Sequence, residues 1–279
     1  MLYQFNDLTR PFQFRNADPV LDAVKLALRG WRIRRWPGMP NVRPAARIVR
    51  TLQGWGISSD KHPIMDPCPD MGDTVCDILA ELGRQYLADL DSVLFMHCAA
   101  FRIGSGVVIV PNTFRAGKSV LTSHMAMRGH RVWCDDIVPV DPTSRTAIAA
   151  GYLPRLRFPL PENSGREFRK FVDDTLVLKG ERYGYIDPGA RNVARFGERL
   201  PIVGAALLDR SETPVTPKIE PITKGLTMRY AINRNFSYQL QGEDMLRAFI
   251  DVLGAAPCYR VTYDAAENAA DMIIDRFSR

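Results

Sequence analysis

The chain has 279 residues, of which 46% are hydrophobic and 24% charged, and its formal net charge is +6. These proportions are ordinary for a soluble globular protein with a substantial core, built as one large domain or as a small domain beside a larger one. Five scattered cysteines without a C-x-x-C pair argue against a disulfide framework and against a zinc site. No apolar run is long enough to cross a bilayer, and the first residues lack the pattern of a secretory signal. We therefore expect a cytoplasmic protein without a membrane span.

Residues 1–90 predict a small α+β region. A short strand-like run opens the chain, Pro19–Leu28 has helical spacing, and Ala46–Ile57 is strand-like. The clearest element is an amphipathic helix at Asp70–Leu87, whose apolar residues share one face: Met71, Val75, Ile78, Leu79, Leu82 and Tyr86. We expect this region to be accessory to the rest of the chain and to take part in substrate recognition.

An arginine-rich segment with interleaved tryptophan lies within the first region. No acidic residue occurs between Asp22 and Asp60, whereas arginines and tryptophans alternate there: Arg29, Trp31, Arg32, Arg34, Arg35, Trp36, Arg43, Arg47 and Arg50. Such a segment suits an anionic partner, such as RNA, single-stranded DNA, an acidic peptide or anionic lipid. The alternative is a solvated face whose arginine stems cover a packed tryptophan.

Residues 91–279 predict a larger α/β domain. It opens with a hairpin of Val93–Arg102 and Val107–Val110, with glycines at the turn. A helix-like run follows at Val120–Met127. The apolar run Val132–Cys134 is expected to form a buried strand next to Val107–Val110.

The remainder of the chain alternates loop, strand and helix. The passage Gly151–Phe171 is rich in proline and arginine, which predicts a loop or an edge strand before a short helix. Ile202–Leu208 is a further buried strand, and Gly242–Leu253 and Ala265–Phe277 are helices. Asp264 and Glu267 have the spacing of a capping box for the last helix. The predicted fold is a mixed central sheet with flanking helices, plus the smaller N-terminal α+β region.

The motif that carries chemistry is Ala116-Gly117-Lys118-Ser119, between the strand at Val107–Val110 and the helix after it. A loop that enters a helix gathers unpaired backbone N–H groups at one point, where the helix dipole adds positive potential. Lysine then reaches the β- and γ-phosphates, and the serine hydroxyl ligates Mg²⁺. Position 112, where the motif has glycine, is Asn112, the residue type that best tolerates left-handed backbone angles.

An acidic pair, Asp135-Asp136, comes directly after the second apolar run. It is expected at the carboxyl end of a strand, where open α/β sheets bind ligands. Because side chains alternate along a strand, one carboxylate can hold Mg²⁺ while the other faces the acceptor as general base. The ordinary alternative for such a pair is a solvated turn.

In this order, His97, Gly117-Lys118-Ser119, Arg128-Gly129-His130 and Asp135-Asp136 resemble the catalytic domain of HPr kinase/phosphorylase and the kinases related to it. The resemblance covers Phe95 to about Val140. It implies a P-loop kinase core of HPr-kinase type, ATP and Mg²⁺ as cofactors, and a homo-oligomer. The glycine-rich signature of the bifunctional enzymes has no match, so the resemblance does not extend to a phosphorylase activity. Residues 1–90 resemble no part of the family, so the resemblance implies a kinase of this superfamily rather than a kinase for HPr itself.

The resemblance also implies roles for individual residues. Asp135, His97 and Lys118 are the expected catalytic residues, and Ser119 and Asp136 the expected metal ligands. The expected ATP-binding residues form one run: Asn112, Thr113, Phe114, Arg115, Ala116, Gly117, Lys118, Ser119 and Val120. From the residues alone, His97 on an apolar strand reads more readily as a core histidine.

Arg155 and Arg157 are candidates for contact with the second substrate. Residues spaced by one point to the same side of an extended segment, where they would clamp a phosphate or an acidic acceptor. Two solvated arginines on a rim are the alternative.

The predicted activity is transfer of the γ-phosphoryl group of ATP to a hydroxyl, favoured as a serine, of a peptide, protein or small molecule. Two other classes stay open at this point. One is a nucleotide-binding switch or scaffold without transfer, and the other is a nucleic-acid-binding protein that uses the segment from Arg29 to Arg50.

Overall fold

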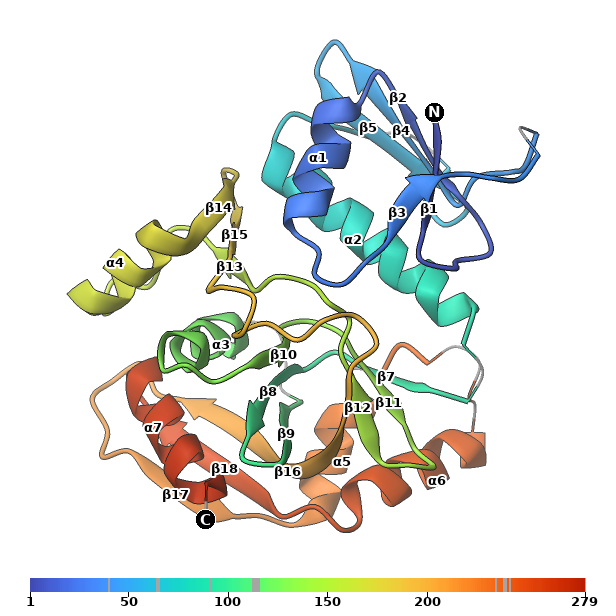
Figure 1. Ribbon diagram of the computed structural model, residues 1–279. Helices are drawn as coiled ribbons and strands as arrows, with labels where there is room; N and C mark the ends of the chain where they lie inside the picture. The colour runs from blue at the N-terminus through green and yellow to red at the C-terminus, as the bar shows by residue number, and fades with distance from the viewer. Residues whose placement is uncertain are drawn as a thin grey trace.

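A computed structural model describes residues 1–39, 41–63, 66–90, 92–111, 116–233, 235–237, 240 and 242–278. The chain folds into mixed α/β structure, with a sheet built from the N-terminal region, a larger central sheet and a small third sheet. In Figure 1 the blue N-terminal sheet lies above the central one, and α2 (Met71–Ala88) runs along the side that faces the rest of the chain.

The N-terminal sheet has the strand order β3-β1-β2-β4-β5-β6. Its strands are β1 (Leu2–Phe5), β2 (Phe12–Arg15), β3 (Ile33–Arg35), β4 (Ala46–Thr51), β5 (Gly54–Ser59) and β6 (Asp66–Cys68). The helices α1 (Asp18–Leu26) and α2 pack against it, and their apolar faces join its strands in one core. The same core takes in Leu153, Tyr185 and Val193 from later in the chain, and the domain boundary near residue 90 stays a prediction.

Helix α2 begins where the sequence predicts. Asp70 is its N-cap, and the Asp70 carboxylate accepts a hydrogen bond from the N–H of Asp73 at 2.9 Å. This bond satisfies one of the backbone donors that a helix start leaves unpaired. Ile78 and Leu82, both on the predicted apolar face, are fully buried.

The central sheet has the strand order β10-β8-β9-β16-β12-β11-β7, with β18 beside β16 and β17 beside β18. Its strands are β7 (Leu94–Met96), β8 (Ala99–Ile103), β9 (Gly106–Val110), β10 (Val132–Cys134), β11 (Val138–Asp141), β12 (Thr146–Ile148), β16 (Arg199–Arg210), β17 (Lys218–Pro221) and β18 (Cys258–Tyr263). β16 runs parallel to both β9 and β18, whereas β8 and β9 form an antiparallel hairpin.

Helices cover both faces of this sheet, and the alternation along β9 shows why. Val107 and Ile109 point into the core beneath α5 (Lys224–Ile232) and α6 (Gly242–Leu253). Val108 and Val110 point into the opposite core, beneath α3 (Lys118–Met127) and α7 (Ala266–Phe277). Because side chains alternate along a strand, an unbroken apolar run serves a sheet buried on both faces.

The third sheet is antiparallel, in the order β13-β15-β14. It consists of β13 (Arg155–Arg157), β14 (Leu176–Lys179) and β15 (Tyr183–Ile186), and α4 (Arg166–Thr175) joins β13 to β14. The passage rich in proline and arginine thus supplies an edge strand and then a helix, as the sequence predicts. Figure 1 shows this unit beside α2 and α3.

Several expected elements differ from the structure. β10 is not next to β9, because β8 lies between them. The single strand expected at Ala46–Ile57 is the hairpin β4–β5, because the chain turns at Leu52, which is fully exposed, and Gly54 has a positive φ of 135°. The first arm of the predicted hairpin, Val93–Arg102, is divided into two strands: β8 forms the hairpin with β9, whereas β7 pairs with β11.

The predicted capping box of α7 is also wrong. The N-cap of this helix is Ala265, one residue later than expected, and it has no side-chain cap hydrogen bond. The Asp264 carboxylate instead accepts a hydrogen bond from the N–H of Ala265 at 2.8 Å. The start of α7 therefore lacks the reciprocal pair that the spacing suggests.

Candidate active site

Two strand ends meet at one edge of the central sheet. β9 and β10 are both antiparallel to β8 and therefore run parallel to each other. After Val110 the chain continues from β9 towards α3, and β10 leads directly into Asp135 and Asp136. The carboxyl ends of parallel strands are where open α/β sheets bind ligands, so the predicted phosphate loop and acidic pair share one edge.

The start of α3 is held by Tyr263 from the end of β18. The Tyr263 hydroxyl donates a hydrogen bond to the carbonyl of Ala116 at 3.1 Å. Burial raises the pKa of Tyr263 to about 12, which keeps this hydroxyl protonated. Ala116 is thus held just before the helix N-terminus, where backbone N–H groups are available to an anion.

Gly117 is the N-cap of α3, and only glycine suits this position. Its φ of 88° and ψ of 9° lie in the left-handed region. A Cβ at Gly117 would come within 2.7 Å of the Tyr263 hydroxyl oxygen, closer than real Cβ atoms approach. The predicted glycine is therefore required by its backbone angles and by its neighbour.

The rest of the predicted ATP-binding run is only partly described. Lys118, the first residue of α3, is buried, while Ser119 and Val120 are half-buried. The remaining residues of the run lie outside the described residues: Asn112, Thr113, Phe114 and Arg115.

Asp135 is a buried carboxyl group with an unsatisfied oxygen. The residue is 7% exposed, and Oδ2 accepts a hydrogen bond from the N–H of Arg155 at 3.2 Å. Within the described residues, Oδ1 has no hydrogen-bond partner. Burial, together with the charge of Asp136, raises the pKa of Asp135 to about 6, although Arg155 and the nearby Ser119 hydroxyl favour the ionised form.

Asp136 is more exposed and is held by two partners. Its Oδ1 lies 3.1 Å from Nδ1 of the buried His97, and its Oδ2 accepts a hydrogen bond from the Arg155 guanidinium at 3.2 Å. The His97 ring also packs edge-on against Phe236, with ring centroids 5.9 Å apart. His97 thus combines the packing of a core histidine with a direct contact to the acidic pair.

Arg155 and Arg157 lie on the same side of β13, as their spacing predicts. Both guanidinium groups lie over the ring of Tyr183, at 4.6 and 5.3 Å from its centroid. Arg157 also donates a hydrogen bond to the Tyr183 hydroxyl at 3.1 Å. Arg155 is the more buried of the two and additionally contacts the Cys76 sulfur on α2.

A cleft of about 420 Å³ brings the predicted site together. Every predicted site residue that the structure describes lines it: His97, Ala116, Gly117, Lys118, Ser119, Val120, Asp135, Asp136, Arg155 and Arg157. These residues come from the start of α3, the end of β10, the link between β7 and β8, and β13. Cationic and anionic side chains face one space, as binding of a nucleotide with a metal requires.

Sequence reasoning missed several residues of this cleft. Tyr183 and Arg210 line it, as do the prolines near β13. Arg210 could have been found, because it comes shortly after the buried strand predicted at Ile202–Leu208 and this strand runs parallel to β9. Tyr183 carried no signal, since its part in the site depends on how β15 pairs with β13.

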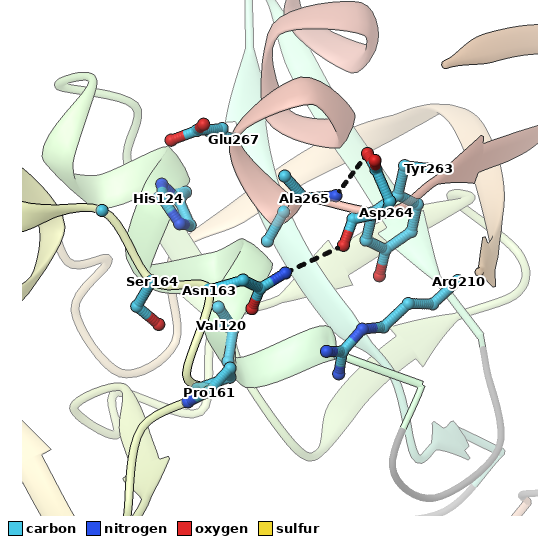
Figure 2. A pocket seen from close by; sticks show the side chains of 13 residues that line it. Val120, His124, Pro161, Asn163, Ser164, Arg210, Tyr263, Asp264, Ala265 and Glu267 are labelled. Carbon is cyan, nitrogen blue, oxygen red and sulfur yellow. Dashed lines mark hydrogen bonds between the residues drawn. The ribbon is translucent and has the colours of Figure 1, made fainter. Parts of the chain in front are cut away.

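A smaller pocket of about 20 Å³ adjoins the cleft, and Gly117, Val120, Pro161 and Arg210 line both. Figure 2 shows it between the starts of α3 and α7 and the segment with Pro161, Asn163 and Ser164 that leads to α4. The Asn163 amide donates a hydrogen bond to the carbonyl of Asp264 at 3.2 Å across this pocket.

His124, at the inner wall of the same pocket, stacks on Phe168 with ring centroids 4.0 Å apart. Burial lowers the pKa of His124 to about 4, so the ring is neutral at physiological pH.

The arginine–tryptophan segment is largely engaged within the chain. Trp31 packs in the N-terminal core, where its indole N–H donates a hydrogen bond to the carbonyl of Ala150 at 2.9 Å. Several of the arginines pair with carboxylates: Arg29 with Asp187, Arg32 and Arg34 with Asp7, and Arg43 with Asp60. These pairs offset part of the positive charge, and an anionic partner for the segment stays a prediction.

Two features are absent from the part of the chain that the structure describes. It has no cluster of three or more histidine, cysteine, aspartate or glutamate side chains that could hold a metal ion by itself. No helix among the described residues is long and apolar enough to span a membrane.

Comparison with known proteins yields a distant likeness to solved structures and no match by sequence. Neither a protein-family model nor a curated protein matches the sequence. Among solved structures, the chain is similar to the HPr(Ser) kinase/phosphatase from Coxiella burnetii, with a TM-score of 0.33 and 13% sequence identity. The match covers 65% of this chain and 93% of that one. This likeness is a weak and distant resemblance in fold only.

Proposed function

We propose that the chain is an ATP-dependent kinase that transfers the γ-phosphoryl group to a serine hydroxyl of a peptide, protein or small molecule. The observation that carries this proposal is the single cleft shared by the start of α3 and by Asp135 and Asp136. Phosphoryl transfer depends on positioning and electrostatic stabilisation more than on covalent help, and this cleft offers both.

The phosphate end of ATP would lie against the start of α3. Gly117, Lys118 and Arg210 line the same space, and the backbone N–H groups at the start of the helix are available to an anion there. Lys118 would balance negative charge that develops on the β- and γ-phosphates during transfer. Arg157, which lines the cleft from β13, would contact the acceptor side.

The residues present fit a magnesium ion. Oxygen ligands, few in number and completed by water and phosphate, are what Mg²⁺ prefers. Ser119 and Asp136 both line the cleft and would hold the ion, which would neutralise phosphate charge. His97 and Arg155 would orient the Asp136 carboxylate for this role.

Asp135 would act as the general base. Asp135 lines the cleft and its Oδ1 has no hydrogen-bond partner among the described residues, so an acceptor hydroxyl placed against this carboxylate would donate to it. The acceptor hydroxyl oxygen would bond to the γ-phosphorus while its proton passes to the carboxylate. The bond between the γ-phosphorus and the bridging oxygen would break, and ADP would leave. Ser119, the other expected metal ligand, also lies near Asp135. The two roles can therefore be exchanged, with Asp135 as the metal ligand and Asp136 as the base; we call this the exchanged assignment.

Transfer of label from γ-labelled ATP, with Mg²⁺, into a lysate of the source organism tests the proposal. Wild type and Lys118→Ala would be compared, with Lys25→Ala on the exposed face of α1 as matched control. We expect labelled species with wild type and with Lys25→Ala, and none with Lys118→Ala. ATP binding without any labelled species would contradict the kinase and favour a nucleotide-binding switch.

A further inference from the structure

A further cavity lies beside the acidic pair. It measures about 60 Å³, and α2 forms one of its walls through Cys76, Leu79 and Ala80. Ile137 and Tyr152 are among the residues that line it from the other elements. α2 belongs to the N-terminal region, which has no part in the kinase-like motifs of the sequence.

This cavity, which we call the α2 pocket, shares a wall with the cleft. Asp135, Asp136 and Arg155 line both spaces. Asp135 is more than nine-tenths buried, and its Oδ1 has no hydrogen-bond partner among the described residues. A buried carboxylate oxygen without a partner is costly, and a ligand hydroxyl would relieve that cost.

The remaining walls of the α2 pocket are mostly apolar or already engaged. The Tyr152 hydroxyl donates a hydrogen bond to the carbonyl of Leu79 at 3.2 Å, and Cys76 contacts the Arg155 guanidinium. A ligand that enters would therefore find its polar contacts at the acidic pair and a mostly apolar surface elsewhere.

The size of the α2 pocket restricts what can enter. One water molecule needs about 10–15 Å³ of such space, so about 60 Å³ admits a group of only a few heavy atoms. A hydroxymethyl or hydroxyethyl side chain meets this limit. The phenol ring of a tyrosine exceeds it.

The α2 wall is held firmly in place. Arg182 donates a hydrogen bond from Nε to the Asp73 carboxylate at 2.7 Å, and the N–H of Glu181 donates to Asp70 at 2.9 Å. Both contacts tie the first turn of α2 to the β14–β15 turn, and β15 pairs with the strand that carries Arg155. The pocket is thus preformed between two anchored elements.

We infer that the α2 pocket receives the hydroxyl-bearing side chain of a serine or threonine acceptor, and that α2 sets this specificity. The inference rests on the proposed kinase function. The acceptor oxygen would bond to the γ-phosphorus, the bond from that phosphorus to the β-phosphate oxygen would break, and the hydroxyl proton would pass to the acidic pair.

The test fills the pocket without touching the acidic pair. Ala80→Leu places a larger side chain in the α2 pocket, and Ala88→Leu makes the same change two turns further along α2 at an exposed position. Transfer from γ-labelled ATP into the lysate would be measured with both variants, and the products would then undergo phosphoamino-acid analysis. ATP binding and thermal unfolding would be measured alongside.

We expect label on serine or threonine, lowered on the order of a hundredfold by Ala80→Leu and unchanged by Ala88→Leu, with ATP binding retained by both. Label that persists with Ala80→Leu, or label on tyrosine or on a small molecule with a bulky alcohol, would overturn the pocket assignment alone. Absence of any label with wild type would overturn the kinase itself. If Ala80→Leu does not fold, Ala80→Val takes its place in the test. Its smaller side chain should give an intermediate loss of transfer.

Discussion

His97 and Asp136 are joined through their side chains, with Nδ1 of His97 3.1 Å from Oδ1 of Asp136, although one residue precedes β8 and the other comes after β10. Arg155 from β13 bonds the second oxygen of the same carboxylate. Asp136 is therefore held from two sides while its side chain remains 40% exposed to the cleft. An oriented carboxylate with room in front of it suits a metal ligand.

Replacement of His97 should weaken the metal-dependent step. His97→Ala removes the contact to Asp136, and we expect the Mg²⁺ concentration for half-maximal transfer to rise about tenfold or more. His97→Asn, which can still donate a hydrogen bond, should lose less. His130→Ala is the control, because the His130 ring contacts the carbonyl of Arg102 and does not line the cleft as the structure describes it. An unchanged Mg²⁺ requirement in His97→Ala would remove His97 from this role.

Gly117→Ala should impair nucleotide binding and stability together. The new methyl group would meet the Tyr263 hydroxyl at 2.7 Å and would also occupy a backbone conformation with a φ of 88°. We expect a loss of about 1–3 kcal/mol in the free energy of unfolding and a clear rise in the Kd for ATP. Gly129→Ala separates the two causes, because Gly129 has a φ of 79° but open space around it. Equal losses in the two variants would show that the contact with Tyr263 contributes nothing.

The raised pKa of Asp135 makes stability depend on pH. Its pKa is about 6 in the folded chain and 3.8 for an ordinary aspartate, which stands for the unfolded chain. Between these two pH values the unfolded chain therefore binds fewer protons than the folded chain. The free energy of unfolding should therefore fall as the pH rises from about 4 to about 6, by up to about 3 kcal/mol from this group. In buffer with EDTA, Asp135→Asn should be more stable than wild type at pH 7, and the difference should vanish below pH 4. Urea unfolding at both pH values measures this, and a variant less stable than wild type at pH 7 would contradict it.

The fold was predictable where a local pattern decides it. The run Val107–Val110 supplies both cores of the central sheet, and the apolar face of α2 has the spacing that its sequence predicts. The order of strands was not predictable, because no local pattern records that β8 lies between β9 and β10. The turn between β4 and β5 was missed for a related reason, since an apolar residue, Leu52, stands fully exposed at it.

The motif residues of the candidate site could be predicted from the sequence. The residues that line the site from other segments could not. Lys118, Asp135 and Asp136 are found together because strand ends meet at one sheet edge. Tyr183 lines the cleft because of the strand pairing in the third sheet, and Cys76 lines the α2 pocket because of the packing of α2. Both depend on contacts between segments far apart in the chain. The same holds for Tyr263, whose hydroxyl explains why position 117 must be glycine.

A single-turnover measurement with Asp135→Asn tests the kinase account most directly. Protein in excess over γ-labelled ATP would be mixed with Mg²⁺ and the acceptor-containing lysate fraction, and the Kd for ATP would be measured separately. We expect the variant to bind ATP as wild type does and to transfer label on the order of a hundredfold to ten-thousandfold more slowly. Asp22→Asn, on the exposed face of α1, should behave as wild type. Transfer by Asp135→Asn at the rate of wild type would contradict Asp135 as the base, and loss of transfer in Asp136→Asn with its Mg²⁺ requirement unchanged would favour the exchanged assignment.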